Sequence, residues 1–171
     1  MALRRIHLRD FVIVRELELD LAGGFTVLTG ETGAGKSILI DAVQLALGSR
    51  ADAGVVREGA ARSEVSVEFD CTPATTEWLG TAGFDQADAL LLRRTVDAQG
   101  KSRAWINGSA ATVAQLREAA DWLIDIHGQH AWQSLTRGPS VRALLDAYAG
   151  IDTAPLNAAW QRWRNAGEAF D

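Results

Sequence analysis

The chain has 171 residues, a length that fits one domain with a short appendage. A hydrophobic fraction of 47%, a charged fraction of 23% and a net charge of −5 indicate a soluble globular domain and argue against a surface that binds nucleic acid throughout, although a local basic face stays open. One cysteine excludes an internal disulfide, and neither a signal peptide nor an apolar run of membrane length is present, so we expect a soluble cytoplasmic protein.

The first 29 residues predict three strands in succession. Residues 6–14 and 15–21 read as two short strands, and the second alternates leucines with acidic residues, which is typical of a half-buried strand. A pair of glycines at 23–24 marks the turn that follows. Residues 25–29, FTVLT, are apolar and β-branched, and they predict a buried strand that leads directly into a glycine-rich loop.

A helix is predicted directly after this loop. Apolar residues recur at helical spacing from Ile38 to Ala46, and Gly48 is a suitable C-terminal stop. Residues 49–63 read as a loop of small residues and arginines, and residues 64–70 alternate as a strand. Thr72 and Pro73 then begin a short helix.

The second half of the chain predicts a hairpin and more helices. Its expected elements are strands at 89–97 and 102–108 with a turn near Gln99–Gly100, a helix at 112–121, a short buried strand at 122–126, a loop at 127–138, and a helix from Pro139 that Gly150 ends. The tail, residues 154–171, is helical in pattern and has no stop signal. We therefore expect the chain to be a piece of a longer protein.

Eight residues between the third predicted strand and its helix match the pattern G-x-x-x-x-G-K-[ST] of phosphate-binding loops. Glycines let the backbone approach a ligand closely, so that the loop amides and the helix N-terminus form an anion-binding nest. In this pattern Lys36 reaches the β- and γ-phosphates of ATP, and the Ser37 hydroxyl ligates Mg²⁺. The predicted ATP-binding residues are Gly30, Glu31, Thr32, Gly33, Ala34, Gly35, Lys36 and Ser37.

Residues 3–150 as a whole resemble the bacterial SMC-like ATPases of DNA repair, which have ABC-type heads. The stretches that carry the resemblance are LRDFVIVRELELDL, GGFTVLTGETGAGKSILIDAVQLALGSRA, VREGAARSEVSVEFD, GKSRAWINGS and LREAADWLIDIHGQHAWQSL. The resemblance implies an α/β fold, a P-loop core with a mixed sheet and an antiparallel lobe. It also implies that residues 1–150 are the N-terminal half of a head and that residues 151–171 begin a coiled-coil helix.

In such heads the nucleotide site is divided between two distant parts of the sequence. The second half supplies the signature motif and a carboxylate that follows an apolar strand. The nearest candidate here is Asp125, which no Glu follows, whereas Asp41 has the wrong position on the loop's helix, and an LSGG-type motif is absent. The resemblance thus implies that this chain holds half of a site and hydrolyses almost no ATP alone.

The resemblance also assigns roles to two further residues. Gln129 falls where the family has a glutamine that ligates Mg²⁺ and orients the attacking water, so Gln129 and Lys36 are the expected catalytic residues. Arg57 is counted with the ATP-binding residues because related heads use an arginine in this region at nucleotide or DNA, with solvated surface charge as the open alternative. His127 and His130 lack further ligands and are expected to be metal-free.

For the whole protein, the resemblance implies ATP-dependent head engagement and DNA tethering in double-strand-break repair and recombination. The implied partners are the C-terminal half of the same head, a second head and DNA, on the nucleoid and without a membrane. A basic group on the predicted hairpin could contact DNA phosphates, although solvation is the more frequent fate of such side chains. This group comprises Arg93, Arg94, Lys101 and Arg103.

Two other classes of function stay open on the sequence. A chain of this length could be a complete small P-loop kinase that phosphorylates a metabolite, but two strands precede the loop and no arginine-rich lid follows late in the chain. A non-catalytic module that binds nucleotide weakly is the third reading. Nucleotide titration and a screen for phosphate transfer to small acceptors discriminate among the three.

Overall fold

A computed structural model of the chain describes residues 2–30, 35–124, 126 and 138–168. The chain falls into two compact units, Met1–Ile124 and Asp125–Asp171. Within the described ranges, no helix has the length and apolar character needed to cross a membrane.

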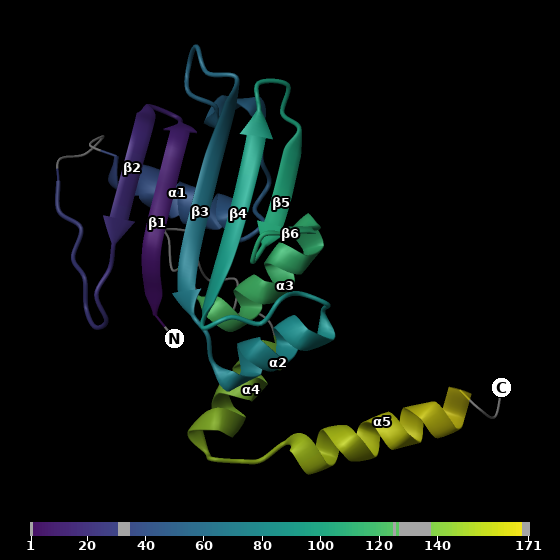
Figure 1. Ribbon diagram of the computed structural model, residues 1–171. Coiled ribbons are helices and arrows are strands. Elements are labelled where there is room, and N and C mark those ends of the chain that lie inside the picture. Colours follow the sequence, from purple (N-terminus) through teal and green to yellow (C-terminus); the bar gives the residue numbers. More distant parts are fainter. Residues whose placement is uncertain (1, 31–34, 125, 127–137, 169–171) are drawn as a thin grey trace. The chain divides into compact units, whose positions relative to one another are not determined.

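The first unit is built on one antiparallel sheet of six strands in the order β2-β1-β3-β4-β5-β6 (Figure 1). Its strands are β1 (Leu3–Phe11), β2 (Val14–Asp20), β3 (Arg62–Asp70), β4 (Ala89–Asp97), β5 (Ser102–Ile106) and β6 (Ser109–Ala111). The strands expected in the first 21 residues, at 64–70 and in the hairpin are confirmed, and so is an antiparallel lobe. The three-residue β6 was not predicted, because it is too short to show alternation.

Alternation along each strand divides the sheet into an inner and an outer face. On β3, for example, Val65, Val67 and Phe69 are buried, whereas the residues between them are half-buried. Apolar side chains of β1, β3, β4 and β5 form the inner face, and charged side chains dominate the outer one. The side chains buried in this core include Ile6, Leu8, Phe11, Val65, Val67, Phe69, Leu90, Leu92, Val96 and Ile106.

Three helices accompany the sheet, with a short 3-10 turn, η1 (Ala53–Val55), in the loop before β3. Helix α1 (Lys36–Ala46) lies behind β1, β3 and β4 in Figure 1 and contacts all three strands, and α3 (Val113–Leu123) contacts β5. Helix α2 (Pro73–Thr81) begins at a capping box, in which the Thr72 side chain accepts from the Thr75 N–H. These helices confirm the periodicities of the sequence.

The C-terminal end of α1 is fastened to the rest of the unit by two arginines. Arg94 of β4 donates to the carbonyl of Leu45 at 2.9 Å and also to that of Ser49. Arg117 of α3 donates to the carbonyl of Gly48 at 2.8 Å. Gly48 has a φ of +94°, and a Cβ there would lie 2.7 Å from Arg117 Cγ, so the close approach of α3 requires glycine. The helix that follows the phosphate loop is thereby held at its far end.

Two strand predictions differ from the structure. Residues 122–126 were expected to form a buried strand, but α3 continues to Leu123, because Leu116, Ala119 and Leu123 extend its buried face. Residues 25–29 form no strand either: they have no ladder partner, and the Phe25 side chain is 94% exposed. A central strand forms only when neighbours satisfy its backbone groups, and none of the described residues does so here.

The described residues of the second unit form two helices, α4 (Gly138–Tyr148) and α5 (Ala154–Glu168). The helix expected after Pro139 is therefore confirmed, and Gly150, with a φ of +65°, follows it as predicted. On α5 the rings of Trp160 and Trp163 stand 4.8 Å apart, and both side chains are exposed.

Candidate functional site

The described part of the phosphate loop consists of its two ends, Gly30 and Gly35–Ser37. Gly35 precedes the first turn of α1 with a φ of +90°, a left-handed conformation that favours glycine. Lys36, the first residue of the helix, directs its Nζ back across the loop and donates to the carbonyl of Gly30. The lysine side chain thus joins the two described ends of the loop. Glu31, Thr32, Gly33 and Ala34, also predicted to bind ATP, lie outside the described residues.

The N-terminus of α1 is electrostatically suited to an anion. Its first turn carries no acidic residue, and the N-cap residue, Gly35, makes no side-chain cap bond. The start of a helix has a positive partial charge, and its first N–H groups, which lack partners further along the helix, can donate to phosphate oxygens. The Ser37 side chain is exposed in this same turn. The residues present therefore fit the phosphate end of a nucleotide.

Few described side chains near the start of α1 could ligate Mg²⁺. Ser37 offers one hydroxyl oxygen, and Asp41, the nearest acid on the helix, is an exposed residue one turn further along α1. No group of three or more His, Cys, Asp or Glu side chains that could hold a metal occurs among the described residues. Asp125, His127, Gln129 and His130 lie outside them, so the expected roles of these residues are not tested.

Arg57 is held by Asp10, which lies near the end of β1. Its Nε lies 2.7 Å from Asp10 Oδ1, and its backbone N–H donates to the Asp10 carbonyl at 2.9 Å. Asp10 itself has a positive φ of 49°, and Val12, two residues later, has a φ of 53°. For a β-branched valine this conformation is strained. The ion pair and the strained turn fix the position of Arg57, whereas its contact with ATP stays a prediction. Sequence reasoning did not single out Asp10, which carries no motif.

The segment that leads into the loop exposes apolar surface. Phe25, Val27 and Leu28 are all exposed, as is Ile40 on the first turns of α1. Exposed apolar patches on protein surfaces are often sites of interaction. The stretch 25–29 has the composition of a buried strand, yet these three of its side chains are exposed.

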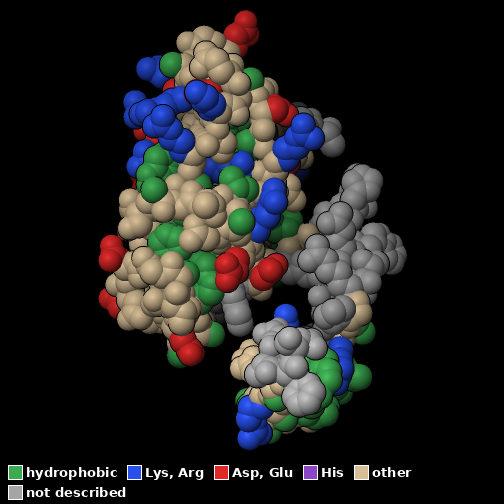
Figure 2. Space-filling model, turned by 90° about the vertical axis from the view of Figure 1, so that its right-hand side faces the viewer, with side chains coloured by type: hydrophobic (Ala, Val, Ile, Leu, Met, Phe, Trp, Pro, Cys, Tyr) green, Lys and Arg blue, Asp and Glu red, His purple; other side chains and the backbone are tan. Residues whose placement is uncertain are grey.

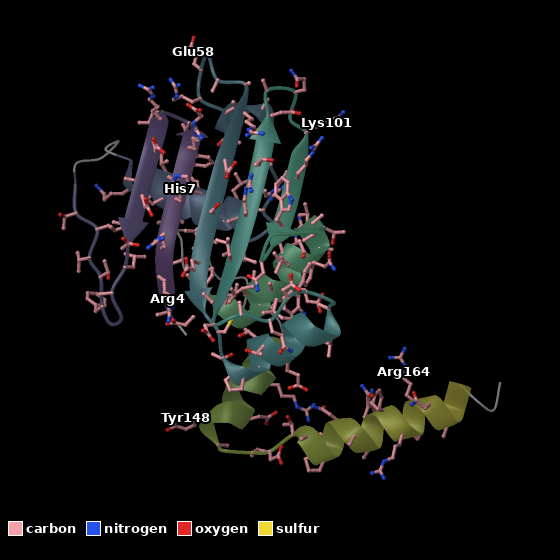
Figure 3. All side chains as sticks on the ribbon, viewed as in Figure 1. Arg4, His7, Glu58, Lys101, Tyr148 and Arg164 are labelled. Carbon is pink, nitrogen blue, oxygen red and sulfur yellow. The ribbon has the colours of Figure 1, made fainter. Side chains whose placement is uncertain are left out.

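The structure separates the four basic residues that the sequence grouped on the hairpin. Arg94 is 3% exposed and faces the core, so the expectation of a solvated side chain is wrong for this residue. Its pKa is lowered, first by burial and then by the nearby charge of Arg117. Arg93, Lys101 and Arg103 lie instead on the outer side of the sheet, where Lys101 marks the β4–β5 turn in Figure 3.

Comparison of the sequence with known proteins gives a consistent result. Residues 5–117 match the family model of the AAA domain. The chain is 49% identical over 154 residues to DNA repair protein RecN of Xylella fastidiosa strain 9a5c, a match that covers 88% of this chain and 28% of that protein. It is 42% identical over 168 residues to RecN of Vibrio cholerae, which covers 96% of this chain and 30% of that one. The chain thus spans less than a third of the length of these curated relatives.

Solved structures share the same fold at low identity. A structure described as part of the structural biochemistry of ATP-driven dimerization and DNA-stimulated activation of SMC ATPases matches with a TM-score of 0.62 at 24% identity, over 85% of this chain and 97% of that one. The SMC head domain from Thermotoga maritima matches with a TM-score of 0.53 at 20% identity, over 69% of this chain and 41% of that one.

Proposed function

The chain belongs to the AAA domain family, and from that premise we propose that it is the ATP-binding segment of an SMC-like ATPase that acts in DNA repair and recombination. Its fold is that of a P-loop ATPase half-head of the ABC type. The observation that carries the proposal is the contact of Lys36 with Gly30 at the N-terminus of α1, whose first turn carries no acidic residue.

The residues present would bind and orient the triphosphate of ATP. Lys36 exchanges the Gly30 carbonyl for phosphate oxygens, because a charge-assisted bond to an anion is stronger than one to a neutral carbonyl. The N–H groups of the first turn of α1 donate to the same phosphates. Ser37 would hold Mg²⁺, which neutralises charge on the phosphate oxygens when it is bound. Arg94 and Arg117 keep α1 in place from its other end.

Hydrolysis is proposed to need one further group of this chain, Gln129, and one group from the rest of the head. Gln129 is proposed to orient the attacking water, and a carboxylate from the second half of the head would complete the Mg²⁺ site. The exposed side chains of Phe25, Val27 and Leu28 support such a completion, since a neighbouring strand would bury them. The chain alone is therefore proposed to bind ATP and to turn over almost none.

The partners follow from the same reasoning. We propose that the C-terminal half of the head packs beside residues 25–29 and that a second head engages in the presence of ATP. The boundary between head and coiled coil is placed at residue 150, so that α5 belongs to the coiled coil. DNA is the proposed substrate of the assembly, which would act on the bacterial nucleoid in the cytoplasm. The relatives named DNA repair protein RecN favour this function over a small-molecule kinase.

Equilibrium titration with a fluorescent ATP analogue tests the proposal. The unmodified chain should bind the nucleotide, and Lys36→Ala should weaken binding at least tenfold, since the lost bond to phosphate is worth about 1.5–3 kcal/mol. Arg15→Ala is a control on the exposed edge strand β2 and should leave the affinity unchanged. Equal affinity of the unmodified chain and Lys36→Ala would contradict the assignment of the loop.

A further inference from the structure

The outer face of the sheet carries a group of cations around a hollow of about 280 Å³. Four of the side chains that line it are Arg62 on β3, Arg93 on β4, Lys101 in the turn and Arg103 on β5. We call these four residues the basic hollow. They face a single carboxylate in its lining, that of Asp97. In a chain with a net charge of −5, this is a strong local excess of positive charge.

Strand register explains why these side chains meet. Arg62 pairs with Asp97, Arg93 with Trp105, and Thr95 with Arg103, and all of these residues alternate with buried neighbours. Arg93 and Arg103 are therefore diagonal neighbours on adjacent strands, about 7–8 Å apart, whereas Asp97 lies directly opposite Arg62. Figure 2, which looks onto the β5 side of the unit, shows Lys and Arg side chains gathered in its upper part.

The cations of the hollow differ in how they are compensated. Arg93 is paired: its Nη2 donates to Glu64 at 3.2 Å, and its Nε lies 2.9 Å from the same carboxylate without being aimed at it. Arg62, Lys101 and Arg103, by contrast, make no ion pair within the described part of the chain. Arg5, on the same face of the sheet, is by contrast ion-paired: its Nε lies 2.6 Å from Asp20 Oδ1. The hollow therefore combines one ion-paired cation with three that make no ion pair within the described residues.

Asp97 is used by the hairpin rather than by the cations. Its Oδ1 accepts the backbone N–H groups of Gln99 at 3.0 Å and of Lys101 at 2.9 Å. Trp105 forms an apolar part of the lining, and the guanidinium carbon of Arg93 lies 4.8 Å from its ring centroid. The cation–π contact keeps Arg93 extended along the surface. Like charges held close together on neighbouring strands repel one another, and a bound polyanion would relieve this repulsion.

We propose that the basic hollow binds the phosphate backbone of DNA without sequence preference. Rows of Arg and Lys side chains that neutralise successive phosphates and release counterions are the general means of such binding. The choice of DNA as the polyanion rests on the proposed function, whereas the position of the site rests on the sheet. The hollow is built from β3, β4 and β5, and Lys36 and the phosphate loop take no part in it.

The test measures DNA affinity of the 171-residue chain as a function of salt, by fluorescence anisotropy of a labelled duplex of mixed sequence. Arg62→Gln, Lys101→Gln and Arg103→Gln should each make the negative slope of log K against log [salt] shallower by about 0.9. The triple variant should lose roughly tenfold or more in affinity near 0.1 M salt. Arg15→Gln is the matched control. It removes one exposed arginine from β2, on the side of the sheet that also carries Leu17, opposite the hollow.

Two conservative variants and one competitor sharpen the result. Arg62→Lys and Arg103→Lys keep the charge and should keep the slope. Inorganic pyrophosphate at a millimolar concentration should compete poorly, because it cannot span several cations at once. The proposal is overturned if the unmodified chain binds no duplex at low salt, if the triple variant keeps the slope, or if pyrophosphate displaces DNA as well as a second duplex does. If the triple variant does not fold, the single variants decide.

The same samples separate this inference from the proposed function. Lys36→Ala should bind DNA like the unmodified chain, and the triple variant should bind the ATP analogue like the unmodified chain. If the unmodified chain binds ATP but not DNA, the proposal for the basic hollow fails and the proposed nucleotide site stands. If it binds DNA but not ATP, the proposed nucleotide site fails and the basic hollow stands.

Discussion

Arg94 reaches from β4 to the last turn of α1, where its Nη1 donates a hydrogen bond of 2.9 Å to the carbonyl oxygen of Leu45. The same guanidinium donates through Nε to Ser102 on β5 at 2.8 Å. One buried cation thereby connects the helix of the phosphate loop to two strands of the antiparallel sheet. A displacement of the hairpin would be transmitted to α1 through this side chain.

We expect Arg94→Leu to lower the free energy of unfolding by about 1.5–3 kcal/mol, because it removes charge-assisted hydrogen bonds to buried groups. The neighbouring Arg93→Gln is the control. Its side chain lies on the outer face and pairs with Glu64, so its loss should cost less than about 1 kcal/mol. Urea denaturation of both variants measures the difference. An effect of Arg94→Leu no larger than that of Arg93→Gln would show that the connection to α1 is unimportant for stability.

Gly48→Ala should destabilise the chain by more than Gly83→Ala does. Both glycines have a positive φ, +94° and +79°, and each substitution adds a left-handed strain of about 1–2 kcal/mol. Only at Gly48 would the new Cβ also meet other atoms, Arg117 Cγ at 2.7 Å and the Val113 carbonyl at 3.0 Å. Thermal unfolding of the two variants compares them. Equal losses would mean that α3 can move away from α1 at no cost.

The alternation of buried and exposed residues along β4 is sufficient to predict that Arg94 faces the core. Arg94 stands two residues from Leu92 and from Val96, both buried, so the strand period alone places it on the inner face. Arg93 and Arg94 share a charge, but as consecutive residues of a strand their side chains face opposite sides of the sheet. The basic hollow, in contrast, depends on the register of β3 against β4 and β5, which alternation within one strand does not contain.

Two segments, residues 122–126 and 25–29, could not be assigned correctly from their local sequence alone. The run from Trp122 to Ile126 is too short to distinguish a strand from the end of a helix, and the buried positions of α3 decide for the helix. Residues 25–29 do have strand composition, but a strand also needs partners. The phosphate-loop motif could be recognised from the sequence because its residues are contiguous. The contact of Lys36 with the Gly30 carbonyl is consistent with a loop whose two ends lie close together.

Lys36→Ala and Gln129→Ala should differ when they are compared in a protein that contains the rest of the head. Lys36 binds phosphate before and during the reaction, so its loss should weaken ATP binding and abolish turnover together. Gln129 should act mainly in the transition state, and Gln129→Ala should keep most of the affinity while it loses turnover. Titration and phosphate release on one preparation give both values. Turnover of Gln129→Ala at the unmodified rate would show that Gln129 does not orient water.

The central claim is that this chain holds one half of an ATPase site, and phosphate release tests it most directly. The release of phosphate from ATP is measured with the purified chain alone and again after addition of a polypeptide that carries the remaining part of the head. We predict almost no release from the chain alone and ATP turnover in the mixture that Lys36→Ala abolishes. A rate of roughly 1–100 per second from the chain alone, typical of kinases, would contradict the account. So would a mixture in which both pieces are folded and bound but release no more phosphate than the chain alone.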